Sequence, residues 1–515
     1  MKKVFFLFLI VFASRFCSAQ IPTFSENVAS IIFNNCTGCH RPGNIAPFSL
    51  TNYDEVSGAA YSIIDAINNK IMPPWPPDSD YRHFVNERVL SNSEIQVIND
   101  WISFGMPEGD TSLLPPLPLF NEGSEIGNPD VQYNLPHYTL GYSVDEYRCF
   151  VIPSQFTQDV FIKAFEFIPG NKLIDHHAVI FWDTTGICNQ LDMQSTEPGY
   201  SSYSSFAGTV YAPKIAIWVP GSPPLVLPEK LGYRIPANAD LIVQVHYPAG
   251  SVGLVDSSKL NIFYQSGFKI RNVSLKTTIN VDDITNGPLI IPADSIKTFY
   301  AQAAFPVKTS LIAVMPHMHL LGKSTKTFAV QPSGDTIKLV SVPDWNFHWQ
   351  GTYLYEKLIV MEENAMVYSE FTYDNTSGNL LNPNNPPETV YSGNSTENEM
   401  LLNAFLSVVY KPGDENIFLN STDDTSTEFS DEFLIYPNPS NGNFVFRSDL
   451  KSNQKISLSI LNMQGVIVKN IASKIEFSQG LDFQIFDVSD LPSGIYLLKV
   501  CTDKAIETKR LVIVK

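Results

Sequence analysis

The chain has 515 residues, too many for one domain; at the usual ~100–200 residues per domain they predict about three or four. Hydrophobic residues make up 44% of the sequence and aromatic residues 12%, which is enough for several packed cores. The formal net charge of −18 argues against a nucleic acid or an anionic membrane surface as partner, because both require basic patches.

Residues 1–19 are typical of a secretory signal peptide. Lys2 and Lys3 precede the apolar run Val4–Ala13, and small residues follow at a plausible cleavage site. No other stretch reaches the ~18 apolar residues of a membrane-spanning helix. We therefore expect an exported protein with no transmembrane segment.

Residues 24–110 predict a small all-α domain, because apolar residues recur there at helical spacing. Ser25 precedes the first helical pattern, and Ser93 precedes the clearest one, which ends at Gly105. Residues 111–130, which contain Pro and Gly, predict a linker.

Residues 36–40 of this domain read Cys-Thr-Gly-Cys-His, the attachment signature of a c-type haem. Cys36 and Cys39 would bond the porphyrin covalently, and His40 would bind the iron from one side. A redox-active or zinc-binding C-x-x-C is the alternative. The position of the motif in an exported helical domain favours haem.

The iron needs a ligand on its opposite side, and three side chains compete for that position. Met72 lies in a Pro-stiffened segment (Ile-Met-Pro-Pro-Trp), whereas Met106 falls in a helix-terminating turn and His83 follows a polar stretch. We favour Met72, because Met/His ligation raises the iron potential and suits electron transfer.

From residue 131 the pattern changes to short runs rich in Val, Ile, Phe and Tyr, separated by Pro, Gly and Asn. Such runs predict antiparallel β-sandwiches. The clearest predicted strands are Val160–Ile168, His177–Trp182, Leu241–Tyr247, Leu311–Met315 and Val367–Tyr373. The expected domains are sandwiches over 131–270 and 271–412, a Ser/Thr/Asp-rich tether over 413–433 and a strand-rich module over 434–515.

Five of the nine histidines fall in three short motifs of the sandwich region. His317 and His319 are two apart, so on a strand they share a face and could chelate one metal. His176 and His177 are adjacent and could share a metal only at a strand end or a bulge. His246 is expected to share its strand face with Gln244, a polar neighbour that could support a ligand. Imidazoles suit copper, zinc, nickel or iron, and a thioether partner favours Cu(I).

Four ordered motifs in this region carry a family resemblance. They are Gly170-Asn171 before Asp175-His176-His177, then Gln244-Val245-His246-Tyr247, His317-Met318-His319 and Thr396-Glu397-Asn398-Glu399-Met400. Together they resemble the copper type II ascorbate-dependent monooxygenases, the family of peptide-amidating and dopamine-hydroxylating enzymes.

The resemblance implies two jelly-roll-like sandwiches that hold one copper ion each. His176, His177 and His246 would form the site that delivers an electron, and His317, His319 and Met400 would form the catalytic site that binds O2. The implied reaction is hydroxylation of a C–H bond of an organic substrate, with ascorbate or another electron donor.

The sequence departs from this family at the substrate. The peptide-amidating enzyme holds its substrate carboxylate with an arginine two residues before the His-x-His motif, where this chain has Met315. Ala404 stands where the same enzyme has an assisting tyrosine. The resemblance implies the metal sites in this chain, but it does not imply that the chain acts on peptides.

The helical domain also resembles small cytochrome c domains that precede such copper domains in bacterial proteins. Its haem is expected to relay electrons to copper, from a small reductant or a redox donor protein. A non-catalytic haem and copper relay, and a surface binding protein with structural copper, are the alternative functions.

The C-terminal module resembles the sorting domain of the type IX secretion system. The resemblance rests on Tyr436-Pro437-Asn438-Pro439, Leu491-Pro492-Ser493-Gly494 and the ending Lys509-Arg510-Leu511. It implies an Ig-like β-sandwich, passage through the periplasm, contact with the secretion machinery and a final place outside the cell. An ordinary carbohydrate-binding module is the alternative.

Three cysteines remain outside the haem motif and the signal peptide. Cys149 and Cys188 could form a disulfide in an oxidising compartment, which would leave Cys501 unpaired.

Overall fold

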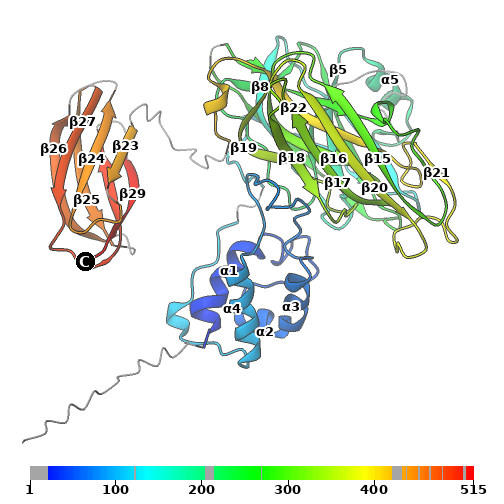
Figure 1. Ribbon diagram of the computed structural model, residues 1–515. Coiled ribbons are helices and arrows are strands. Elements are labelled where there is room, and N and C mark those ends of the chain that lie inside the picture. The colour runs from blue at the N-terminus through cyan, green and yellow to red at the C-terminus, as the bar shows by residue number, and fades with distance from the viewer. Residues whose placement is uncertain are drawn as a thin grey trace, which may run out of the picture. The chain divides into compact units, whose positions relative to one another are not determined.

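A computed structural model describes residues 21–515 except 121–122, 203–213, 268, 420–431, 437, 451–452, 463–465, 478–479 and 503–505. The signal-peptide prediction for residues 1–19 lies outside this range, as does most of the predicted tether. The chain forms two compact units, Met1–Asn420 and Ser421–Lys515. It is mainly β, with few helices and several separate sheets (Figure 1). Within the described residues, no helix is long and apolar enough to cross a membrane.

The first unit begins with the expected group of helices, drawn in blue in Figure 1. They are η1 (Phe24–Val28), α1 (Ala29–Asn35), α2 (Tyr53–Gly58), α3 (Ala60–Asn68), α4 (Asn92–Ser103) and η2 (Thr111–Leu113).

The caps of these helices differ from the sequence predictions. The first is Thr23, whose hydroxyl accepts a hydrogen bond from the backbone N–H of Glu26, and Ser25 is buried inside the first turn. Helix α4 begins after Ser91, which forms a reciprocal capping box with Glu94. Both corrections move the cap two residues towards the N-terminus, because a Ser or Thr caps only where its backbone is still extended.

A β-sandwich follows, built from two five-stranded sheets, in the orders β1-β11-β4-β8-β12 and β6-β3-β9-β5-β7, with the small pair β10-β2. The strands are β1 (Val131–Asn134), β2 (Tyr138–Thr139), β3 (Glu146–Pro153), β4 (Val160–Ile168), β5 (His177–Asp183), β6 (Tyr200–Ser201), β7 (Lys214–Trp218), β8 (Leu231–Ile235), β9 (Asp240–Tyr247), β10 (Val255–Asp256), β11 (Lys259–Tyr264) and β12 (Arg271–Asn272). One helix, α5 (Ile187–Gln194), lies between β5 and β6 in the sequence.

A second sandwich has two four-stranded sheets, β13-β22-β16-β19 and β15-β20-β17-β18, and the pair β14-β21. Its strands are β13 (Ser274–Ile279), β14 (Ile290–Ile291), β15 (Ser295–Ala304), β16 (Thr309–His317), β17 (Gly322–Val330), β18 (Thr336–Val342), β19 (Tyr353–Met361), β20 (Met366–Asn375), β21 (Val390–Tyr391) and β22 (Leu402–Val409). Short helical turns occur at η3 (Val281–Asp283) and η4 (Asp414–Asn416). All five strands that we predicted from the sequence are present.

The cores explain why these parts form one unit. The core of the first sandwich continues into the second through buried residues such as Ile312, Leu358 and Leu406. Phe84, which follows the third helix of the N-terminal domain, is buried in the core of the second sandwich. Because burial of shared apolar surface opposes separation, these contacts fix the helical domain and the sandwiches as one body.

The second unit is a smaller β-structure with sheets β23-β24-β27 and β26-β25-β28-β29. Its strands are β23 (Glu432–Tyr436), β24 (Asn443–Leu450), β25 (Gln454–Leu461), β26 (Ile467–Phe477), β27 (Gly480–Asp487), β28 (Gly494–Cys501) and β29 (Ile506–Ile513). Phe444, Phe446 and Phe477 are buried in its core. These aromatic side chains therefore pack internally instead of forming a binding platform.

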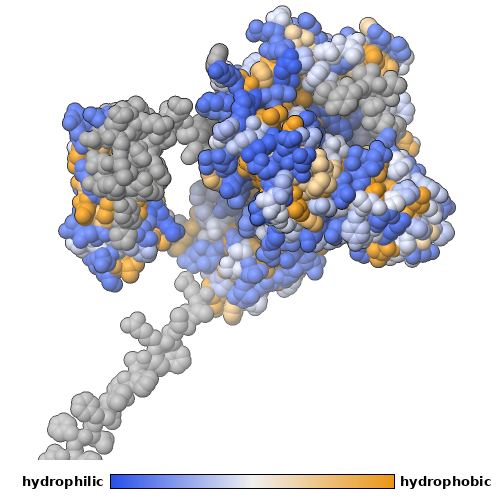
Figure 2. Space-filling model, turned by 45° about the horizontal axis from the view of Figure 1, so that its top comes forward, coloured by the Kyte–Doolittle hydropathy of each residue, from blue (hydrophilic) through white to orange (hydrophobic). Residues whose placement is uncertain are grey.

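The face of the molecule in Figure 2 is covered mainly by hydrophilic residues, with hydrophobic ones scattered between them. Such a mixture is typical of a protein face in contact with water.

Candidate metal centres

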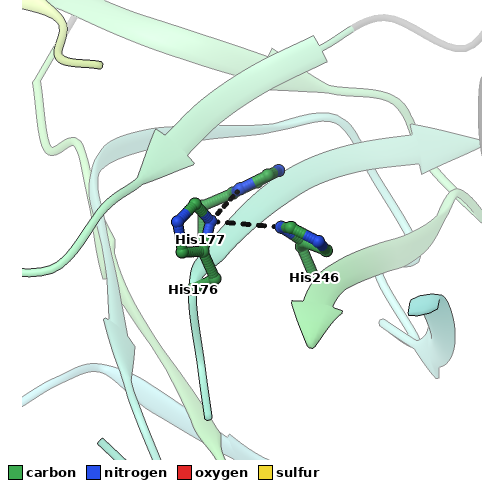
Figure 3. A group of neighbouring side chains, drawn as sticks. All are labelled: His176, His177 and His246. Carbon is green, nitrogen blue, oxygen red and sulfur yellow. Dashed lines mark hydrogen bonds between the residues drawn. The ribbon is translucent and has the colours of Figure 1, made fainter. Parts of the chain in front are cut away.

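Three histidines of the first sandwich meet where two neighbouring strands of one sheet end, as Figure 3 shows. His177 is the first residue of β5 and stands directly opposite His246 of β9. His176 lies just before β5, and its backbone N–H donates to the carbonyl oxygen of His246 at 3.0 Å. The strand end thus turns two adjacent side chains towards one point, as the sequence predicts.

The Nδ1 atoms of this trio converge. His176 Nδ1 lies 3.3 Å from His177 Nδ1 and 3.1 Å from His246 Nδ1. The metal-binding atoms of the three rings all lie within 4.8 Å of one another. A neutral imidazole offers one lone pair, so convergent nitrogens of this kind fit a cation that accepts nitrogen donors.

The surroundings favour the uncharged form of two of these histidines, His176 and His177. Burial, and then the neighbouring histidines, lower the pKa of His176 to about 4. The same causes hold the pKa of His177 well below its usual value. Neutral imidazole is the form that binds a metal.

The outer side of His246 is supported by two residues that the sequence did not indicate. Asp145 Oδ2 lies 3.6 Å from His246 Nε2, and the Tyr147 ring stacks on the His246 ring at 4.2 Å. The expected role of Gln244 is wrong. Its amide donates to the carbonyl oxygen of Ser202 at 2.8 Å and approaches Cys149 Sγ at 3.6 Å. Asp145 is therefore a carboxylate beside Nε2 at ion-pair distance, while His246 Nε2 has no hydrogen-bond partner among the described residues.

The second histidine group lies in the second sandwich, where β16 ends. His317 is the last residue of that strand, and the rings of His317 and His319 lie 5.1 Å apart. His317 Nδ1 is hydrogen-bonded to Gln350 Oε1, and His319 Nδ1 lies 3.0 Å from the carbonyl oxygen of Asn398. Since each Nδ1 meets an oxygen acceptor, it carries the proton, and Nε2 remains for a metal.

Burial also keeps this pair uncharged. It lowers the pKa of His317 to about 3, with a further contribution from His319, and burial is the main cause that lowers the pKa of His319. The pair therefore supplies two neutral nitrogen donors.

A buried carboxylate joins this pair to Met400. Glu399 is fully buried, and its Oε2 accepts from the backbone N–H groups of His319 at 2.9 Å and Met400 at 3.2 Å. Its Oε1 accepts from the N–H of Leu321 at 2.7 Å. The hydroxyl of Tyr373 donates to the carbonyl oxygen of Met400 at 2.7 Å. These bonds hold the backbone of Met400 beside the His319 segment, although the two are far apart in the sequence.

The haem motif has the geometry that an axial histidine needs. His40 Nδ1 lies 3.0 Å from the carbonyl oxygen of Phe48, which leaves Nε2 for iron. Burial raises the pKa of the Cys36 thiol to about 12 and also raises that of Cys39.

The three candidates for the second iron ligand have different surroundings. Met72 lines the same cavity as Cys36, Cys39 and His40. Met106 packs against the core of the helical domain, and His83 pairs with Glu87. Only Met72 of the three therefore faces the space beside the haem motif.

One cavity of about 1730 Å³ connects the haem motif with both histidine groups. Its lining includes Cys36, Cys39, His40, Met72, His176, His177, His317, His319 and Met400. Residues 218–225 of the first sandwich form part of its wall, and a Cβ on Gly221 would lie 3.3 Å from Cys39 Sγ. The haem motif thus meets the first sandwich directly.

Phe347 lies between the two histidine groups, and no sequence motif indicated it. Its ring centre is 6.3 Å from that of His176 and 6.1 Å from that of His319. His348 follows with its ring 5.8 Å from His176. A single Phe-His pair has no spacing pattern, so only the folded chain identifies these residues as neighbours of the sites.

The disulfide considered from the sequence is not formed. Cys149 and Cys188 are both free thiols, buried in one small cluster with Tyr200. Burial raises the pKa of Cys149 to about 12 and that of Cys188 to about 11. In this structure the two thiols act as small core residues.

Comparison with known families assigns the second unit. Residues 434–514 match the family described as a secretion system C-terminal sorting domain. The type IX sorting module expected from the sequence is thereby confirmed. The protein is exported, to the cell surface or the extracellular space. The matched residues do not include either histidine group or the haem motif.

The sequence matches no curated protein. Among solved structures, a β-glucuronidase from Ruminococcus gnavus is 7% identical, with a TM-score of 0.14 over 47% of this chain and 44% of its own. Dimeric latent PorU from Porphyromonas gingivalis is 10% identical, with a TM-score of 0.16 over 71% of this chain and 34% of its own. The chain therefore spans less than half the length of these proteins, and such low TM-scores carry no inference.

Proposed function

We propose that this protein is an exported copper-dependent monooxygenase that hydroxylates a C–H bond with O2 and two electrons. The observation that carries the proposal is the common cavity, because two separate sets of histidine donors and a c-type haem motif all line it. The haem would itself occupy the end of the cavity at Cys36, Cys39 and His40, and the end lined by the histidine groups is where a substrate would lie.

In this proposal His176, His177 and His246 hold one copper ion, and His317, His319 and Met400 hold the other. When bound, the two coppers would supply one-electron redox chemistry and O2 reduction, each contributing one of the two electrons. The donor sets support this division, since a thioether favours Cu(I) and leaves a softer, weaker site than three imidazoles.

The protein's own residues would orient these ligands and shape the space for substrate. Asp145 lies beside Nε2 of His246, Gln350 directs which nitrogen of His317 is available, and Glu399 fixes the segment between His319 and Met400. The cavity walls would exclude bulk water from the bound C–H group, which limits side reactions.

The haem would relay electrons from ascorbate or a redox donor protein to the copper of the trio. The close approach of Gly221 to Cys39 Sγ supports this order, because residues 218–225 follow β7, which pairs with β5, the strand that begins at His177.

The proposal is tested by loading the full chain with Cu(II), removing excess metal and measuring O2 uptake with ascorbate and candidate substrates. We expect two coppers per chain and O2 uptake that depends on substrate. We also expect the reduced haem to reoxidise faster, under O2 and substrate, in the copper-loaded than in the copper-free protein. Full loading without uptake would favour the non-catalytic relay, and equal reoxidation rates would remove the haem from the path.

The assignment of Met72 has its own test. Replacing Met72 with Leu removes the thioether, so the Met/His absorption band of the ferric haem near the red end of the spectrum should disappear and the reduction potential should fall. Met106→Leu is the matched control and should leave both unchanged. Loss of the band in Met106→Leu, with Met72→Leu unaffected, would assign the ligand to Met106.

A further inference from the structure

The positive side chains that line the cavity are not equivalent. Arg88 donates to the carbonyl oxygen of Gly221 at 3.0 Å, and Lys172 donates to that of Gly43 at 3.2 Å. Arg41 donates to carbonyl oxygens of the haem motif segment. These three cations are already bonded at the haem end of the cavity. Lys214 lines the same cavity and has a different environment.

The strand pattern turns Lys214 towards the histidine groups. Lys214 begins β7 and pairs with Phe181 of β5, while the next residue, Ile215, is buried in the core of the first sandwich. Side chains alternate along a strand, so Lys214 leaves β7 on the face opposite to that core. His177 and Val179, on the same strand face as Phe181, line the cavity too.

Lys214 stands close to both candidate copper sites. Its charge contributes to the lowered pKa of His177 in the trio and of His317 in the pair. Among the residues that the structure describes, none accepts a hydrogen bond from the Lys214 ammonium or forms an ion pair with it. Desolvation by the surrounding protein atoms lowers the pKa of this ammonium.

The walls around this ammonium are largely apolar. Near the histidine groups they include Ile217, Met315, Leu402, Ala404 and Leu406. Lys214 is exposed and lines the cavity, so an anion that enters the cavity can accept a charge-assisted hydrogen bond from its ammonium. The apolar walls would accept a hydrocarbon attached to the anion.

We propose that Lys214 binds the carboxylate of an apolar organic acid and holds its hydrocarbon part between the two histidine groups. Lys214 is then a specificity-determining residue, and the substrate class of the proposed monooxygenase is organic carboxylates. That the bound acid is a substrate rests on the proposed function, whereas the anion site at Lys214 does not.

The test compares an acid with its neutral amide, using 4-phenylbutyrate and 4-phenylbutanamide as probes. Binding to the full haem-containing chain is measured by calorimetry, first without copper, so that the carboxylate cannot coordinate the metal. We expect the acid to bind about tenfold or more tightly than the amide, because a charge-assisted hydrogen bond is made only by the acid. Equal affinities would overturn the proposal.

Variants at two lysines assign the preference to a residue. Lys214→Met should abolish the preference for the acid, and Lys214→Arg should retain most of it. Lys276→Met is the matched control, because Lys276 also lines the cavity. Lys276 pairs with Phe405, and paired residues share a sheet face. Phe405 is buried in the core of the second sandwich, so the Lys276 side chain leaves the sheet on that face and not towards the histidine groups. An undiminished preference in Lys214→Met, or its loss in Lys276→Met, would overturn the assignment.

Copper content and haem potential are measured on the same samples. Two coppers and an unchanged haem potential in Lys214→Met are expected, and they show that the variant is folded. A shifted haem potential, with acid binding intact, would mean that the lysine serves a haem propionate and would overturn the proposal. If the wild-type chain binds no copper but still prefers the acid, the proposed function fails while the anion site stands.

Discussion

The two histidine groups use the same side chain in opposite ways. In the trio, the Nδ1 atoms point at one another. In the pair, each Nδ1 is hydrogen-bonded to an oxygen, of Gln350 or of Asn398, so that Nε2 is the free donor. The difference teaches that the residue type supplies a possible ligand, but the partner of the second ring nitrogen selects which atom binds.

The two groups are also held by different means. His177 and His246 are neighbours in a β-ladder, where backbone hydrogen bonds fix their separation. His319 and Met400 lie outside strands and are joined through the carboxylate of Glu399. We therefore expect the geometry of the trio to depend on the backbone of its sheet. The geometry of the second site should depend on one buried side chain, that of Glu399.

The largest effect is expected from removal of a ligand. His246→Ala and His319→Ala should each lower the copper content from two to one per chain and reduce turnover by roughly a hundredfold or more, since even outer partners of metal ligands are worth about 10–100-fold. Copper analysis and electron paramagnetic resonance should show a different remaining signal in each variant. If either substitution removed both coppers, the two sites would not be independent.

The next largest effect concerns Glu399. Glu399→Ala leaves three buried backbone N–H groups without an acceptor, so it should destabilise the first unit by roughly 3 kcal/mol and weaken copper binding at the second site alone. Thermal unfolding and copper titration measure the two effects. Glu397→Gln, an exposed change in the same segment, is the control and should alter neither. If Glu399→Ala weakened copper binding equally at the trio, the two sites would not be held by different means.

Smaller effects are expected from the partners of the outer ring nitrogens. Gln350→Leu should weaken copper at the second site about 10–100-fold, and Asp145→Asn should do so at the trio. Each change leaves every metal ligand in place. Competitive titration with a Cu(I) chelator gives both affinities. If Gln350→Leu weakened copper binding at the trio, the two sites would not be held independently.

The smallest effect is a pH dependence of the copper-free protein. The folded-state pKa of His176 is lowered to about 4, so below about pH 6.5 the unfolded chain binds a proton that the folded chain does not. Stability should therefore fall as the pH falls from about 6.5 to 4, by about 1 kcal/mol between pH 6 and pH 5 for this one group. Denaturant unfolding of wild type and His176→Gln measures it, and the variant should lose less stability. An identical pH dependence would contradict burial of a neutral His176.

Much of the local structure was predictable from the sequence, because it depends on residues that are near one another in the chain. Alternation of apolar residues predicted strands such as Val160–Ile168 and Leu241–Tyr247, and the pattern of residues 36–40 predicted the haem motif. The adjacency of His176 and His177 restricted a shared metal to a strand end or a bulge. The sorting module was likewise recognisable from its own short motifs.

The partners of the site residues were decided by the tertiary structure alone. Asp145 lies beside His246 while the Gln244 amide donates to Ser202, and Glu399 reaches back to the His319 segment across 80 residues of sequence. Lys214 stands in the cavity because the next residue packs into a core. Such contacts depend on which sheets pack together, and the periodicity of a single strand contains no information about that choice. The sequence by itself therefore determined which residues can act, and packing between distant segments decided how each of them is oriented.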